Sequence, residues 1–126
     1  MPVQPMPTPL RDVVLGLTAE RQLREVPQQP GSPPIRIDGY TIGAPLCTRN
    51  PPHGGEMHPD GDELLFLISG RVTVIFQEAT GDRTVRLAVG EALVVPRGTW
   101  HRVDIEEPSQ LLHITPGPGG QYRPLR

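Results

Sequence analysis

The sequence predicts an all-β fold, a jelly roll or closed antiparallel barrel with about eight short strands. From residue 35 onward, apolar and β-branched residues occur in short runs that turn-forming residues separate at near-regular spacing. Glycine and proline, at 14 and 17 of 126 residues, are abundant although the chain has no internal repeat. This length suits one domain with a single core.

The first 34 residues are predicted to form a proline-rich extension that contains a short helix. Residues 10–26 place apolar side chains at a spacing that suggests a helix, although Gly16 weakens its first half. Thr18 is a candidate N-cap for the segment that follows it. Residues 26–34 contain four prolines, so they cannot continue a helix, and we interpret them as a linker.

Residues 35–117 are the predicted barrel, and residues 118–126 are predicted to be a C-terminal tail. Ser69-Gly70 is expected to form a tight turn between two strands, and Gly81 another. The expected extended segments are residues 35–46, 64–70, 71–77, 83–89, 91–96, 101–107 and 110–117.

Charge and composition argue against several classes of partner. The formal charge of −2 gives no electrostatic reason to expect binding to nucleic acid or to an anionic membrane. The single cysteine, Cys47, excludes an internal disulfide. Because the sequence shows no bilayer-spanning apolar run and no signal-peptide pattern, a cytoplasmic location is expected.

Four potential metal ligands lie in two short stretches of the sequence. Glu56 and His58 are two residues apart, so they share one face of a strand. The turn-forming residues 59–62 return the chain so that Glu63 can face the same interior. His101 arrives on a distant strand after a turn that contains proline and glycine. Imidazole and carboxylate groups are suitable ligands for zinc, iron, manganese, nickel or copper.

The same two stretches, residues 54–70 and 90–101, resemble the paired motifs of the cupin superfamily. Those motifs read G, five residues, H-x-H, three or four residues, E, six residues, G, and then G, five residues, P-x-G, two residues, H, three residues, N. The matching positions are Glu56, His58, Glu63 and Gly70 in the first motif and Gly90, Pro96, Gly98 and His101 in the second. The resemblance covers most of residues 38–115. It implies a small single-domain cupin with a double-stranded β-helix, or jelly-roll, barrel that holds one divalent metal ion.

Three positions depart from the motif pattern. The leading glycine of the first motif falls on Asn50, and the closing asparagine of the second falls on Ile105. The first ligand position, normally histidine, is Glu56. His58, Glu63 and His101 alone form a two-histidine, one-carboxylate set, so Glu56 would be either a fourth ligand or a nearby base.

The resemblance implies three classes of function. The first is an oxygenase that acts on a small organic acid or aromatic compound, with Glu56 or Glu63 as the catalytic residue that moves a proton. The second is an isomerase, epimerase or lyase in which the metal acts only as a Lewis acid. The third is a non-catalytic module that binds a small ligand or a metal. Small cupins commonly pair through edge strands, so the resemblance also implies a homodimer.

Other residues near the motifs have two interpretations each. Tyr40, Trp100 and Arg97 could line a substrate pocket, although packing or surface charge is the more common role of such residues. His113 lies between Leu112 and Ile114 and is expected to face away from the site.

Overall fold

The computed structural model describes residues 5–125. Residues 1–4 and 126, which belong to the predicted N-terminal extension and C-terminal tail, lie outside the described part. Within residues 5–125 the chain forms ten strands, all joined by antiparallel pairing, and no helix. The strands are β1 (Leu15–Thr18), β2 (Leu23–Glu25), β3 (Gly39–Gly43), β4 (Leu46–Cys47), β5 (Gly55–Met57), β6 (Glu63–Glu78), β7 (Gly81–Leu87), β8 (Ala92–Val95), β9 (His101–Gly117) and β10 (Gln121–Arg123). The all-β prediction is confirmed, and no helix of the described residues is long and apolar enough to cross a membrane.

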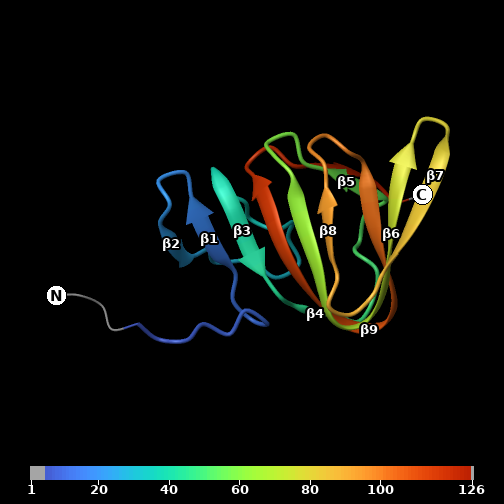
Figure 1. Cartoon of the computed structure of the whole chain (residues 1–126). Helices are drawn as coiled ribbons and strands as arrows, with labels where there is room; N and C mark the ends of the chain where they lie inside the picture. The colour runs from blue at the N-terminus through green and yellow to red at the C-terminus, as the bar shows by residue number, and fades with distance from the viewer. Residues whose placement is uncertain (1–4, 126) are drawn as a thin grey trace.

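Two long bent strands, β6 and β9, pair with each other and organise the barrel (Figure 1). The first part of β6 also pairs with β8, and its second part pairs with β7. The expected tight turn at Ser69-Gly70 is wrong, because β6 continues through these residues with shifts of register between Leu67 and Val72. Gly70 makes this bend possible: its φ is +92°, and a Cβ atom there would collide with the Ser109 hydroxyl.

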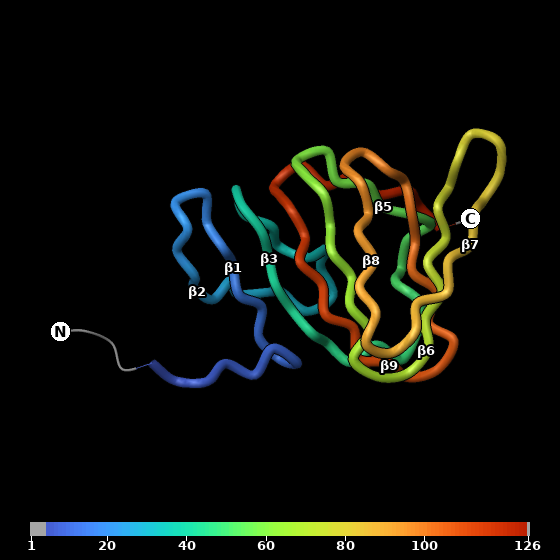
Figure 2. The backbone as a smooth tube through the Cα atoms, viewed as in Figure 1, coloured from blue at the N-terminus to red at the C-terminus, as the bar shows by residue number. Residues whose placement is uncertain are grey.

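The remaining strands build the wall around this pair. β3 pairs with the C-terminal part of β9, and β4 pairs with its centre. β5 meets the start of β9, and β10 lies on the other side of β5. Figure 2 shows how these segments, distant in sequence, wrap around a common interior.

The N-terminal segment forms a β-hairpin, so the predicted helix in residues 10–26 is wrong. β1 pairs with both β2 and β3, which extends the barrel sheet (Figure 1). Thr18 does not cap a helix; its hydroxyl accepts a hydrogen bond from the Gln22 amide at 3.0 Å across the hairpin loop. Gly16 packs so closely against Val26 and Ile37 that a Cβ atom would lie 2.6 and 2.7 Å from their side chains. Pairing with β3 and this close packing outweigh the weak local preference for a helix.

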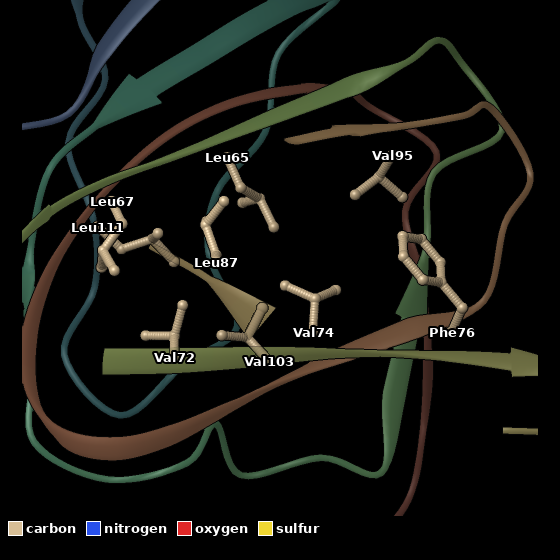
Figure 3. Packing of buried hydrophobic residues seen from close by; sticks show 9 residues of the cluster. All are labelled: Leu65, Leu67, Val72, Val74, Phe76, Leu87, Val95, Val103 and Leu111. Carbon is tan, nitrogen blue, oxygen red and sulfur yellow. The ribbon is translucent and has the colours of Figure 1, made fainter. Parts of the chain in front are cut away.

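The apolar core lies inside the barrel, and its residues come from β6, β7, β8 and β9 (Figure 3). It consists of Leu65, Leu67, Val72, Val74, Phe76, Leu87, Val95, Val103 and Leu111. In β6 the core residues are odd-numbered before the bend and even-numbered after it, because the register shift changes which residues face inward. Phe76 and Val95 lie together at one end of the core. Their cross-strand partners are His101 and Glu63, so the predicted metal ligands begin where the apolar core ends.

Candidate metal centre

The structure brings Glu56, His58, Glu63 and His101 together at one end of the barrel. Glu56 on β5 lies directly opposite His101, the first residue of β9. Glu63 is the first residue of β6, and His58 follows β5. One potential ligand atom from each of the four residues lies within 4.8 Å of the others. These four residues could therefore hold a metal ion.

Most of this cluster is closed off from solvent. His101 is fully buried, and His58 and Glu63 are each 3% exposed. His101 Nε2 lies 2.9 Å from Glu63 Oε1 and 3.4 Å from Glu56 Oε1. His58 Nε2 lies 3.5 Å from Glu63 Oε2 and 3.8 Å from Glu56 Oε1. The Nε2 atoms of His58 and His101 thus both face the two carboxylates.

His58 provides a test of whether these residues fit a metal ion. Its Nε2 atom is buried and has no hydrogen-bond partner among the described residues. Buried polar atoms are rarely left without a partner, and coordination of an ion would satisfy this nitrogen. Two neutral imidazoles and two carboxylates would also cancel the charge of a divalent ion. The donor set therefore fits a divalent metal by atom type, burial and charge.

Hydrogen bonds from outside the cluster orient two of its members. His101 Nδ1 lies 2.9 Å from the Thr99 carbonyl oxygen, an interaction that places the proton on Nδ1 and leaves Nε2 available as a ligand. The Thr115 hydroxyl donates to Glu63 Oε2 at 2.7 Å. Such contacts are the usual supports of metal ligands in proteins.

Without a metal, the cluster retains a proton. Burial alone would lower the pKa of His101, but its contacts with Glu56 and Glu63 outweigh burial and raise the pKa to about 10. Burial alone would raise the pKa of Glu56, but His101 and His58 bring it well below its usual range. A metal ion would have to displace the proton on His101.

A cavity of about 540 Å³ leads to this cluster, and both Glu56 and Glu63 line it. Its apolar lining includes Leu46, Leu65, Val103, Ile105 and Leu111, and its polar lining includes Arg36, Arg49, Thr48, His113 and Thr115. The expectation that His113 faces away from the site is wrong. His113 faces inward together with Leu111 and Thr115, the residues two positions before and after it. Because alternate residues of a strand face the same side, this spacing is the feature of the sequence that indicates the orientation of His113.

Tyr40, Trp100 and Arg97 are not among the residues that line this cavity. The Tyr40 hydroxyl lies beside Gly61, and the Arg123 guanidinium lies 4.1 Å from the centre of the Trp100 ring. Arg97 is exposed, and its backbone amide donates to Asp62. Sequence reasoning missed Arg36, because nothing in the local sequence indicates that residues preceding β3 reach the cavity.

His53 also lies closer to the cluster than its position beside two prolines suggests. Its Nε2 is 3.8 Å from Glu56 Oε2, and its ring packs against Tyr122 of β10 at 5.2 Å between ring centres. His53 further lines a larger hollow of about 1010 Å³, whose lining includes none of the four potential ligands. The smaller cavity is therefore the one connected with the cluster.

The fold and the site together define a small antiparallel β-barrel with a histidine and glutamate cluster at one end that could hold a metal ion. The cupin domain family matches residues 49–115, more than half of the chain. The chain therefore belongs to the cupin family, as its two motifs predict. No curated protein matches the chain in sequence.

Several solved structures share the fold. A cupin-2 domain protein from Shewanella frigidimarina is 22% identical, with a TM-score of 0.54 over 71% of this chain and 84% of that protein. Peruvianin-I, a cysteine peptidase from Thevetia peruviana latex, is 19% identical, with a TM-score of 0.56 over 70% of this chain and 58% of its own. Oxalate decarboxylase from Bacillus subtilis, which has Mn(II) centres, is 19% identical, with a TM-score of 0.53 over 66% of this chain and 23% of its own. At these identities the likeness shows the fold alone.

Two of the departures from the motif pattern contact each other. The Ile105 amide donates a hydrogen bond to Asn50 Oδ1 at 2.6 Å. Asn50 thereby ties the segment before β5 to the N-terminal part of β9. This bond gives the two departures a shared structural role.

Proposed function

We propose that this cupin is a metal-dependent enzyme of the oxygenase type that acts on a small organic molecule. Glu56, His58, Glu63 and His101 would hold one divalent ion. The observation that carries the proposal is the cavity of about 540 Å³ that reaches two of these four residues, because it gives a small molecule access to the ion. When bound, a redox-active ion would supply electron transfer to dioxygen, whereas zinc would supply Lewis acidity only.

The two glutamates have different surroundings, which favours different roles. Glu63 is 3% exposed and its Oε2 accepts a hydrogen bond from the Thr115 hydroxyl, so its carboxylate is held in one orientation. The Glu56 side chain is 16% exposed, lines the cavity and lies near His53. Glu56 is therefore better placed to exchange a proton with a substrate, and Glu63 to serve as a fixed ligand.

A second candidate is an isomerase, epimerase or lyase that uses the ion only as a Lewis acid. The observation that favours it is the carboxylate of Glu56 at the cavity wall, where it can take a proton from a bound substrate. The oxygenase and Lewis-acid candidates share the metal ligands and differ in their need for oxygen.

Metal analysis tests the feature that both candidates require. We expect about one transition-metal ion per chain in protein purified without added metal, and a large loss in His58→Ala and His101→Ala. Glu107→Gln, which changes an exposed carboxylate on β9, is the matched control and should retain the ion. Wild-type stoichiometry near zero would remove both candidates and leave a binding module.

The identity of the ion and the need for oxygen then separate the candidates. Iron with oxygen uptake on a panel of small organic acids and aromatic compounds would support the oxygenase. Zinc or manganese with oxygen-independent turnover would support Lewis-acid chemistry.

Replacing Glu56 with histidine tests its role. If Glu56 is a ligand, Glu56→His should retain metal with a changed identity or affinity. Loss of turnover with unchanged metal content would instead assign Glu56 to proton transfer.

A further inference from the structure

The cavity contains a set of linked polar residues beyond the metal ligands. The Thr115 hydroxyl lies 2.7 Å from Glu63 Oε2 and 2.9 Å from His113 Nδ1. A carboxylate only accepts, so Thr115 must donate its single hydrogen to Glu63. Thr115 must then accept from His113, which places the proton of the His113 ring on Nδ1.

This tautomer leaves the Nε2 atom of His113 as a hydrogen-bond acceptor. The atom has no hydrogen-bond partner among residues 5–125, and His113 lines the cavity. Burial and then the positive charge of Arg36 lower the pKa of His113 to about 4, so the ring is neutral near pH 7. Gly43, opposite His113 on β3, leaves space for the ring, since a Cβ atom there would lie 2.8 Å from Nε2.

Arg36 lines the same cavity and is only partly satisfied. Its Nη1 donates to the Thr41 hydroxyl at 2.5 Å, whereas its Nε is buried without a partner. Within the described residues, no carboxylate lies at ion-pairing distance from Arg36. Two glutamates and a divalent ion would cancel each other, so the charge of Arg36 would remain uncompensated in the cavity. Its planar group of donors matches the geometry of a carboxylate.

We propose that Arg36 and His113 select the ligand: Arg36 binds a carboxylate, and His113 Nε2 accepts a hydrogen bond from a neighbouring hydroxyl. The ligand class is then a small hydroxy acid, whose hydrocarbon part packs against the apolar wall that includes Leu65 and Leu111. The inference rests on the proposed function for the use of this cavity. It goes further by naming the substrate class and the two residues that recognise it.

Binding measurements on the metal-free and zinc-loaded protein test this assignment. The probes are lactate and mandelate, their deoxy counterparts propanoate and phenylacetate, and the amides lactamide and mandelamide, each titrated by calorimetry. We expect the hydroxy acids to bind more tightly than both the deoxy acids and the amides.

Substitutions separate the two contacts. Arg36→Gln should weaken binding of the hydroxy acids by about tenfold or more and remove their preference over the amides. Arg36→Lys should retain part of that preference, because it keeps the positive charge. His113→Leu should remove the preference for hydroxy acids over deoxy acids and leave the affinity for deoxy acids unchanged. Arg97→Gln, at an exposed arginine that does not line the cavity, is the control and should change neither preference.

The outcomes distinguish this inference from the proposed function. Absence of saturable binding by any acid, or acid-to-amide ratios unaffected by Arg36→Gln in folded protein, would overturn the inference even if the protein binds metal and turns over a substrate. Arg36-dependent binding of acids to the metal-free protein would support it even if no metal is found. Thermal unfolding of each variant shows whether the protein is folded.

Discussion

At the scale of single residues, the candidate metal centre depends on groups that are not ligands. Thr115 and the Thr99 carbonyl hold Glu63 and His101 in orientations that leave Glu63 Oε1 and His101 Nε2 facing each other at 2.9 Å. Because these contacts exist before an ion binds, binding requires no further ordering of the Glu63 and His101 side chains. Thr115 is the more informative of the two, since a side chain can be replaced.

Thr115→Val keeps the shape of the side chain and removes the hydroxyl that donates to Glu63. We expect metal affinity to fall by about tenfold to a hundredfold, without complete loss, because supporting hydrogen bonds usually contribute that much. Competition titration with a chelating dye would measure the change. Thr84→Val, on the exposed face of β7, is the control. Unchanged affinity in Thr115→Val would show that this hydrogen bond does not orient the ligand.

The protonation of His101 predicts how stability depends on pH in the metal-free protein. Its pKa rises on folding from an ordinary value of 6.5 to about 10, so folded protein binds a proton that unfolded protein releases between these values. This stabilisation is complete below pH 6.5 and is lost as pH rises toward 10. The lowered pKa of Glu56 acts oppositely, because its stabilisation is present above about pH 4.5 and is lost as pH falls.

We therefore expect chelator-treated protein to be most stable between about pH 4.5 and 6.5, measured by urea unfolding across pH. Glu56→Gln should flatten the decline above pH 6.5, because it removes one of the carboxylates that retain the proton. A free energy of unfolding that rises from pH 6.5 to 9 would contradict this assignment.

The four candidate metal ligands could be predicted to lie together from the sequence, because their spacing carries the information. Glu56 and His58 share parity, and the turn at residues 59–62 and the Pro96-x-Gly98 turn place Glu63 and His101. His113 was missed because its apolar neighbours were interpreted as the buried pair, whereas the inner face is formed by Leu111, His113 and Thr115. Arg36 reaches the cavity through tertiary packing, which no local pattern records.

At the scale of elements, the bend in β6 decides which residues face the interior. Before Gly70 the inward residues are odd-numbered, as Glu63 is, and after it they are even-numbered, as Phe76 is. β6 can thus place Glu63 at its start and core residues both before and after the bend. The sequence showed two strands here, since glycine indicates a turn as readily as a bulge.

Gly70→Ala should strongly destabilise the protein. Its left-handed φ and the collision of a new Cβ atom with Ser109 should together lower the free energy of unfolding by about 2 kcal/mol or more. Gly90→Ala is the matched control, because Gly90 also has a positive φ of +85°, but a Cβ atom added there would meet no other atom within 4 Å. It should cost only about 1 kcal/mol for the backbone. Equal losses in urea unfolding would show that packing at the bend is unimportant.

The N-terminal hairpin shows why local patterns were insufficient for that element. Its apolar residues fit a helical period over a short stretch, but β3 offers β1 a complete set of backbone partners. That opportunity depends on a strand more than twenty residues away in sequence. Only the folded sheet reveals it.

At the scale of the whole molecule, the apolar core and the candidate metal centre occupy one interior. The core ends at Phe76 and Val95, whose cross-strand partners are His101 and Glu63. An ion bound at this boundary would stabilise the folded state alone, because the four donors are brought together only by folding.

Zinc in excess over the protein should therefore raise the melting temperature. At a free concentration one hundred times the dissociation constant, the expected gain is about 2.7 kcal/mol, or roughly 10 °C for a domain of this size. Differential scanning fluorimetry with and without chelator would measure it. His58→Ala should abolish the shift, and a full shift in that variant would place the ion elsewhere.

The distance in sequence between Glu63 and His101 has a mechanical consequence. These two residues are 38 positions apart, and β7 and β8 lie between them. An ion held by both would close that stretch into a loop, as a disulfide does, in a chain whose single cysteine cannot form one internally. The ion would then act as a removable cross-link between the start of β6 and the start of β9, and its loss would lower the free energy of unfolding.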